Sequence, residues 1–194
     1  VPEGKTCKLL LYRKGEASLL ASYVFSDRIG SVCYLAVDGL KEEAYEYNYD
    51  IDGESVTDSY AKALSGKEIW LENIGMPEKN KENVRGIFYE DHYDWEGDQS
   101  PRIREEELTA YAMHVRGFTK DTHSKVKSKG TFQGVIEKIP YLKDLGINQI
   151  QCMPVYEFEE AGMRVNYWGY GPGYYFAPKS AYAKDGDGVK GLKD

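Results

Sequence analysis

Three closely spaced glutamates, Glu157, Glu159 and Glu160, are the most obvious candidates for chemistry in this sequence. Neighbouring carboxylates can act as a general acid and a general base. They follow the expected strand 147–153 on a loop, however, and a run of acids is usually a solvated surface. We therefore favour a surface role for these residues over a catalytic one.

Basic and sulfur-containing side chains form no other obvious site. A polar loop carries His123 and four lysines, for which exposure is the default interpretation: Lys120, Lys125, Lys127 and Lys129. The three cysteines are far apart and include no Cys-x-x-Cys pair, so neither a zinc site nor a disulfide framework is indicated. We expect Cys7, Cys33 and Cys152 to be buried thiols, and we expect no metal and no cofactor.

Aromatic residues are unusually frequent, since 17 Tyr, 6 Phe and 3 Trp make up 13% of the chain. Flat rings with a polar tip can serve a core, an interface or a surface that stacks on sugars. Taken alone, the triplet Trp168-Gly169-Tyr170 favours packing beneath a long loop. In Tyr45–Ile51 the rings share one strand face, which suits a core. Trp70 and Trp95 remain candidates for sugar contact, and Trp70 is the better guess for exposure.

The overall charge and the hydrophobic pattern exclude two classes of partner. A net charge of −7, from 32 acids and 25 bases, argues against a nucleic-acid partner. The apolar runs fall far short of the roughly 20 residues that span a bilayer, so no membrane partner is expected. Residues 1–4 show no signal-peptide pattern. A cytoplasmic location is favoured, and secretion after removal of a signal peptide stays open.

The elements that must position these residues change in type along the chain. Short runs rich in Leu, Val and Tyr are separated by turn residues and predict strands over 7–12, 21–25, 31–37, 45–51 and 55–57. Asp52-Gly53 favours a tight hairpin between the last two, because Gly accepts a positive φ. Several short strands with turns between them indicate an antiparallel β-sandwich.

In the second half, apolar residues are spaced as in a helix, and this helical segment lies between two predicted strands. A mostly apolar run at 110–116 precedes a helical face that repeats every three or four residues: Phe132, Val135, Ile136, Ile139, Leu142 and Leu145. Thr131 is the expected cap and Gly146 the expected stop, and Pro140 predicts a bend near Ile139. The strand at 147–153 follows, so the segment reads as a βαβ unit with parallel strands.

The predicted boundary lies in the polar stretch between these two patterns. We expect a β-rich domain over residues 1–100, a linker over 101–107 and the start of an α/β domain over 108–194. The last ten residues indicate a loop that enters another helix.

Five motifs follow one another along the second half: Tyr111 to Thr119, Gly130 to Phe132, Ile139 to Ile147, Met153 to Val155 and Asn166 to Tyr170. In this order they resemble the opening of the catalytic barrel of alpha-amylase superfamily glycoside hydrolases, on the branch of type I pullulanases, isoamylases and glycogen-debranching enzymes. In the first half, Val56 to Ala63 is similar to the segment that closes the carbohydrate-binding module of those enzymes. Asp94 to Asp98 is similar to their linker.

The resemblance implies a fold and a set of site residues. The fold is an immunoglobulin-like β-sandwich module followed by the first strands and helix of a (β/α)8 TIM barrel, which at this length is incomplete because a barrel needs about 250 residues. Tyr170 would stack on the sugar ring beside the scissile bond, and Trp168 would shape the pocket. His114 is expected to be a buried histidine satisfied by the backbone, and Arg116 to pair with an acid.

The implied activity is retaining hydrolysis of α-1,6-glucosidic bonds in pullulan, glycogen or starch by the complete enzyme. The family's catalytic carboxylates belong to later strands, so this chain is expected to contain none and to be inactive alone. Two alternatives stay open: a noncatalytic glucan-binding protein, and a glucan branching or transfer enzyme on the same scaffold.

Overall fold

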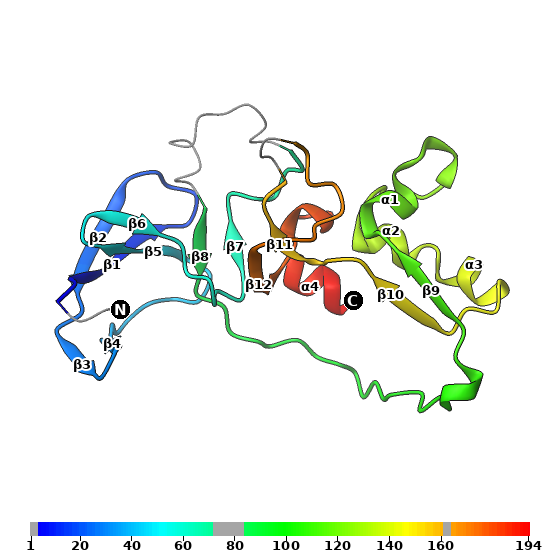
Figure 1. The fold of residues 1–194 in the computed structure, drawn as a ribbon, viewed down its shortest axis with the longest axis horizontal. Helices are drawn as coiled ribbons and strands as arrows, with labels where there is room; N and C mark the ends of the chain where they lie inside the picture. Colours follow the sequence, from blue (N-terminus) through cyan, green and yellow to red (C-terminus); the bar gives the residue numbers. More distant parts are fainter. Residues whose placement is uncertain (1–3, 72–83, 161–163) are drawn as a thin grey trace.

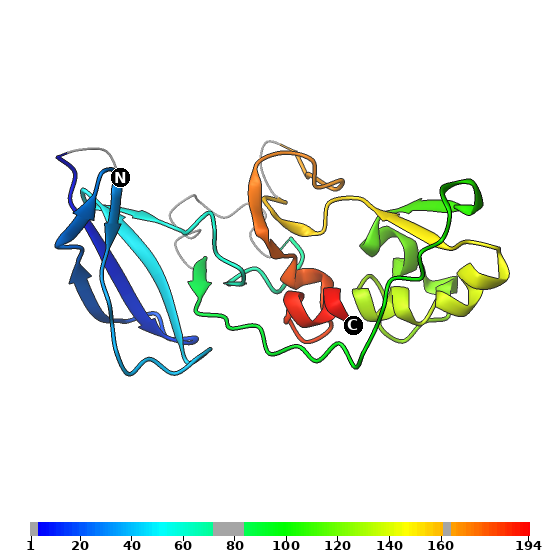
Figure 2. The same cartoon turned by 90° about the horizontal axis from the view of Figure 1, so that it is seen from below.

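The computed structural model describes residues 4–71, 84–160 and 164–194, and it shows an elongated molecule with three parts. A β-sheet lies at one end, a parallel strand pair with three helices lies at the other, and a hairpin with a short helix lies between them (Figures 1 and 2). Residues 1–3, which belong to the stretch without a signal-peptide pattern, lie outside the described residues. Within the described part, no helix is long and apolar enough to span a bilayer.

The first part is an antiparallel sheet with the order β2-β1-β5-β8-β7, and β6 pairs with β5. Its strands are β1 (Cys7–Arg13), β2 (Leu19–Val24), β5 (Tyr45–Ile51), β6 (Glu54–Val56), β7 (Leu64–Ser65) and β8 (Arg85–Ile87). A separate hairpin joins β3 (Asp27–Ile29) to β4 (Val32–Tyr34), so the strand expected at 31–37 is much shorter. The strand-rich character of the first half is confirmed, and its closure into a two-sheet sandwich stays a prediction.

The Asp52-Gly53 hairpin forms as expected. Ile51 pairs with Glu54 across a two-residue turn, and Asp52 and Gly53 both have positive φ, at 53° and 89°. This combination belongs to a type I′ turn, whose twist matches the flanking strands.

Strand β5 is buried on both faces. Tyr47 packs on Phe88 with ring centroids 4.5 Å apart, which confirms the core interpretation for the middle ring of the series. On the other face Glu46 is buried against Arg85, with 3.2 Å between its carboxylate and the guanidinium. The Arg85 guanidinium also lies 3.6 Å from the centre of the Tyr12 ring. This pairing offsets the cost of removing the two charges from water.

A long connection leads from β8 to β9 and contains the 3₁₀ turn η2 (Glu105–Glu107). The expected linker 101–107 lies within it, and the division into domains stays a prediction. The two halves nevertheless share a core, because Ala61, Leu64 and Val84 pack with Ala177 and Tyr174.

The βαβ unit is confirmed. Strands β9 (Ala110–Met113) and β10 (Gln149–Cys152) are parallel, with Tyr111 opposite Ile150. The segment between them forms α1 (Val115–Lys120), η3 (Thr122–Ser124), α2 (Phe132–Ile136) and α3 (Ile139–Asp144). The bend expected near Ile139 is a full break between α2 and α3, with Pro140 in the first turn of α3, where its missing N–H is not needed.

The predicted apolar face of α2 and α3 is only partly covered. Phe132 and Leu142 are buried, whereas Ile136, Ile139 and Leu145 are exposed. The reason is the small sheet, since β9 and β10 offer only two strands for the helices to cover.

The middle part consists of β11 (Tyr156–Phe158), β12 (Gly173–Pro178), η4 (Ser180–Tyr182) and α4 (Gly188–Lys193). Strands β11 and β12 are antiparallel. The expected terminal helix is confirmed as α4, which begins after Asp187, whose side chain accepts a hydrogen bond from the Lys190 N–H.

All three cysteines are free, but the expectation of buried thiols is correct only for Cys7. Cys33 is half-buried, and Cys152 is exposed because β10 forms an uncovered edge of the two-stranded sheet.

The cap of α2 gives a test of this local structure. The Thr131 hydroxyl accepts a hydrogen bond from the Gly134 N–H at 3.2 Å. Thr131→Ala should lower the free energy of unfolding by about 1 kcal/mol, because that N–H loses its partner. Urea denaturation measures the change, and Thr131→Ser should restore most of the loss. Equal midpoints for the wild type and the alanine variant would show that the cap does not stabilise the fold.

Candidate functional site

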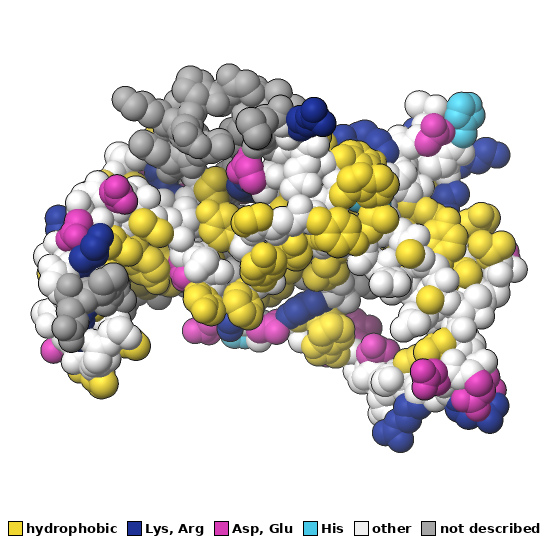
Figure 3. All heavy atoms as spheres, in the orientation of Figure 1, with side chains coloured by type: hydrophobic (Ala, Val, Ile, Leu, Met, Phe, Trp, Pro, Cys, Tyr) yellow, Lys and Arg dark blue, Asp and Glu magenta, His cyan; other side chains and the backbone are white. Residues whose placement is uncertain are grey.

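The candidate site is the loop of residues 166–171 between β11 and β12, called the aromatic loop below. It presents Trp168 and Tyr170 to solvent, with 56% and 67% of their surfaces exposed. Exposed hydrophobic side chains gather over β11 and β12 on the face shown in Figure 3. Both predicted site residues therefore have ring surface free to meet a ligand, and the alternative of packing beneath a loop does not describe them.

Gly169 lets this loop approach the protein interior closely. Its φ is +83°, and a Cβ there would lie 2.4 Å from the ring of the buried Phe158. A glycine is therefore required here, both for the sharp turn and for the close contact with Phe158.

Asn166 ties the base of the aromatic loop. Its side-chain oxygen accepts the Gly169 N–H at 3.1 Å, and its side-chain amide donates to the Glu159 carbonyl at 3.3 Å. Its backbone N–H donates to the Glu160 carbonyl at 2.8 Å. From the other side, the Tyr156 hydroxyl donates to the carbonyls of Gly169 and Gly171, both at 3.2 Å.

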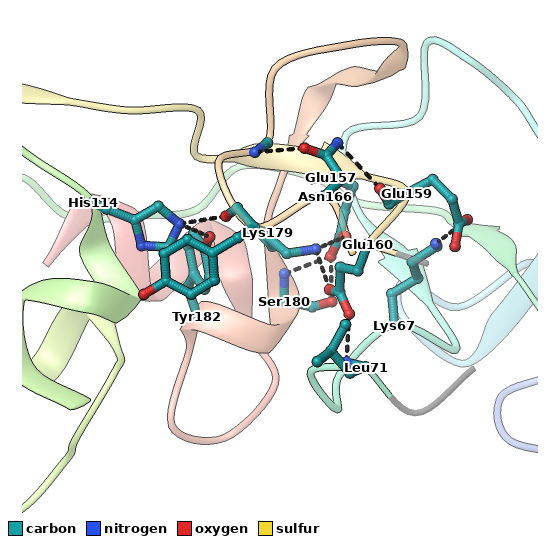
Figure 4. Close-up of polar contacts among 12 residues, drawn as sticks. Lys67, Leu71, His114, Glu157, Glu159, Glu160, Asn166, Lys179, Ser180 and Tyr182 are labelled. Carbon is teal, nitrogen blue, oxygen red and sulfur yellow. Dashed lines mark hydrogen bonds and ion pairs between the residues drawn. The ribbon is translucent and has the colours of Figure 1, made fainter. Parts of the chain in front are cut away.

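His114 holds the loop from β9. It directly follows that strand, it is 7% exposed, and its ring stacks on Tyr167 at 4.5 Å. Its Nδ1 accepts the Gly117 N–H at 2.9 Å, so Nε2 carries the proton and donates to the Tyr167 carbonyl at 2.8 Å. The Tyr182 hydroxyl lies 3.1 Å from the same Nε2. The expectation of a buried histidine satisfied by the backbone is confirmed (Figure 4).

Because Trp168 lies beside His114, with ring centroids 6.2 Å apart, the aromatic loop lies at the carboxyl end of the parallel strands. In α/β barrels that end carries the active site.

Two expectations about neighbouring residues are wrong. Trp70 is half-buried rather than exposed, and it stacks on Tyr182 at 5.7 Å within the second-half core. Arg116 does not pair with an acid within the described structure; its guanidinium lies 5.0 Å from the centre of the Trp70 ring. Both errors have the same cause, which is that residue 70 inserts among residues of the second half. Trp95, in contrast, is 52% exposed and packs edge-on against Tyr93.

The interpretation of the three glutamates as solvated surface is also wrong for two of them. Glu157 is fully buried and Glu160 is 6% exposed, because the fully buried ammonium of Lys179 lies between them at 3.2 Å and 2.5 Å (Figure 4). Glu157 also accepts the N–H and hydroxyl of Ser180. Burial raises the pKa of Glu157, against the opposing effect of Lys179. Glu159 is half-buried and pairs with Lys67 at 2.9 Å.

Sequence reasoning missed Lys179, Tyr156 and Asn166 as supports of the loop. Asn166 belongs to the motif Asn166 to Tyr170. Its position three residues before Gly169 could have predicted that its side chain accepts the Gly169 N–H, because Asn side chains often hydrogen-bond to nearby backbone groups in turns. No local pattern marked Lys179. Away from the loop, Glu42, Glu90 and His92 bring possible ligand atoms within 4.8 Å of one another on the surface, as exposed acidic groups often do without an ion.

The buried state of His114 predicts a pH dependence. Burial lowers its pKa in the folded protein, so the unfolded chain binds a proton there more readily. The contribution to stability should be complete above the unfolded pKa of about 6.5 and should decrease as the pH falls below it. Denaturant titrations at about pH 7.5 and about pH 5 should show a smaller loss in His114→Gln than in the wild type. His123→Gln, at an exposed histidine, is the control and should follow the wild type.

The family model of the alpha-amylase catalytic domain matches residues 87–174 of this chain. Isoamylase 1 from the chloroplast of Arabidopsis thaliana is 34% identical over 182 residues, which cover 81% of this chain and 23% of that protein. The glycogen operon protein GlgX homolog of Haemophilus influenzae is 31% identical, over 80% of this chain and 27% of its own length.

Among solved structures, the pullulanase from Bacillus acidopullulyticus aligns with a TM-score of 0.75 at 26% identity, over 97% of this chain and 24% of that chain. The chain thus spans about a quarter of the length of these relatives. On these matches, the chain is part of a member of the alpha-amylase family of glycoside hydrolases, on the branch of the isoamylases and type I pullulanases.

Proposed function

We propose that this chain is the amino-terminal part of an α-glucan debranching hydrolase, in which Tyr170 stacks on the sugar next to the bond that is cut and Trp168 shapes the pocket. The observation that carries the proposal is the position of the aromatic loop, which exposes both rings beside the carboxyl end of β9. The relatives named above include an isoamylase and a pullulanase, and one solved structure of similar fold is a pullulanase from Bacillus subtilis complexed with maltose.

In this proposal the chain combines a β-sandwich module of carbohydrate-binding type, over about residues 1–100, with the first strands and helices of a (β/α)8 barrel. The parallel pair β9 and β10, with helices between them, supports the barrel assignment. The six-stranded antiparallel sheet supports the module.

In the proposed mechanism, the residues that hold the sugar are different from the carboxylates that cleave the bond. Retaining hydrolysis needs one carboxylate as nucleophile and a second as acid and base. Glu157 and Glu160 cannot approach a substrate, because both are buried against Lys179. In the proposal, these two glutamates therefore serve the supporting network and not bond cleavage. Its contribution is to hold a glucose ring, since a flat aromatic face covers the apolar CH face of the sugar.

Tyr170→Ala in the full-length protein tests the proposal. The variant should release reducing ends from pullulan about a hundredfold more slowly, because the reacting sugar is no longer held in a productive orientation. Circular dichroism and the unfolding midpoint should be unchanged, since Tyr170 is mostly exposed.

The matched control is Tyr141→Ala, which removes a 52% exposed tyrosine from α3. This variant should retain the wild-type rate. Equal rates for Tyr170→Ala and the wild type would show that the stacking assignment is wrong. Binding of pullulan by the wild type without any release of reducing ends would instead indicate a noncatalytic glucan-binding protein, and rearranged chains would indicate a branching or transfer enzyme.

A further inference from the structure

Glu159 and Glu160 contact two separate segments, residues 67–71 through their side chains and the aromatic loop through their main chain. Their side chains hold residues 67–71, called the exit segment below, which come after β7 and before β8 of the first sheet. Glu159 pairs with the Lys67 ammonium at 2.9 Å, and Glu160 accepts the Leu71 N–H at 2.5 Å. The partners lie about ninety positions apart in sequence, so these contacts join the two halves of the chain.

The main chain of the same two glutamates holds the aromatic loop. The Glu159 carbonyl accepts the side-chain amide of Asn166, and the Glu160 carbonyl accepts its backbone N–H. Asn166 in turn accepts the N–H of Gly169, which lies between the two exposed rings. Figure 4 shows Asn166 and Lys67 on either side of Glu159.

These contacts are partly shielded from water. Lys67 is 8% exposed, and Glu160, which is 6% exposed, also pairs with the fully buried Lys179, whereas 42% of the Glu159 side chain is exposed. Shielded ion pairs with several hydrogen bonds hold a fixed geometry, whereas surface pairs exchange freely with solvent. A second contact supports the same link, since the Trp70 ring of the exit segment packs edge-on against Tyr167 of the aromatic loop at 6.1 Å.

We propose that Glu159 and Glu160 are positioning residues which couple the docking of the exit segment to the shape of the aromatic loop, so that the first half of the chain sets the affinity of the loop for an α-glucan. The coupling follows from the contacts above, and only the identity of the ligand rests on the proposed function. Neither glutamate touches the sugar in this proposal.

The test uses single variants of the Lys67–Glu159 pair in the full-length protein, together with two measurements. Lys67→Met and Glu159→Gln should each speed hydrogen exchange of the peptide that covers residues 166–171 by about tenfold, because the loop loses an anchor. Each should weaken the binding of maltotetraose, followed by calorimetry, by a similar factor. The double variant should be no worse than Glu159→Gln alone, since that variant already removes the link to Lys67.

The control is Lys193→Met, which breaks another ion pair between the halves. Lys193 pairs with Asp91 at 2.5 Å, and its side chain is 19% exposed. This variant should leave both measurements at wild-type values. Glu160→Gln is not used for the test, because it also removes a partner of the buried Lys179 and would destabilise the fold.

Two results would overturn the coupling. One is unchanged exchange of the aromatic loop in Lys67→Met and Glu159→Gln, and the other is an equal response in Lys193→Met. If the wild type does not bind maltotetraose but the exchange responds as expected, the coupling stands and the proposed glucan ligand is wrong. The failure of one proposal is therefore distinguishable from the failure of the other.

Discussion

The structure around the aromatic loop depends on one buried charge, the ammonium of Lys179. An ammonium removed from water is very costly unless carboxylates and hydrogen bonds surround it. Here Glu157 and Glu160 supply the carboxylates, and the Phe158 ring lies 4.2 Å from the ammonium. Because these partners come from β11 and from the residues after it, satisfying Lys179 fixes the hairpin. The Leu71 N–H bound to Glu160 then brings the first half of the chain to the same point.

The packing consequently crosses the division between strand-rich and α/β sequence. Trp70 lies among Phe158, His114 and Tyr182, and Ala61 and Leu64 share a core with Ala177. The two halves therefore do not pack as independent units. The exit segment, between β7 and β8, forms part of the support for the candidate site.

Local patterns were sufficient for the elements whose cause is local. The Asp52-Gly53 hairpin and the Thr131 cap depend on a few adjacent residues, and both were predicted. Pro140 likewise predicted an interruption near Ile139, which was expected as a bend and is a full break. Trp168 and Tyr170 were singled out as site residues by the resemblance to the family, because the local pattern of residues alone favoured packing beneath a loop. Trp70, Arg116 and the buried glutamates were misjudged because their surroundings come from residues far away in sequence. A buried Glu and a solvated Glu look the same until the position of Lys179 is known.

The division between positioning and bond cleavage explains why the loop is so firmly held. A ring that selects and orients a sugar gains affinity when it is fixed before the sugar arrives, because less freedom is lost on binding. The chain achieves this with hydrogen bonds between the main chain of the loop and the side chains of Asn166, His114 and Tyr156, while Trp168 and Tyr170 stay exposed. The carboxylates nearby are used in the supporting network. In the proposed function, this loop therefore orients the sugar, and bond cleavage is left to carboxylates outside the supporting network.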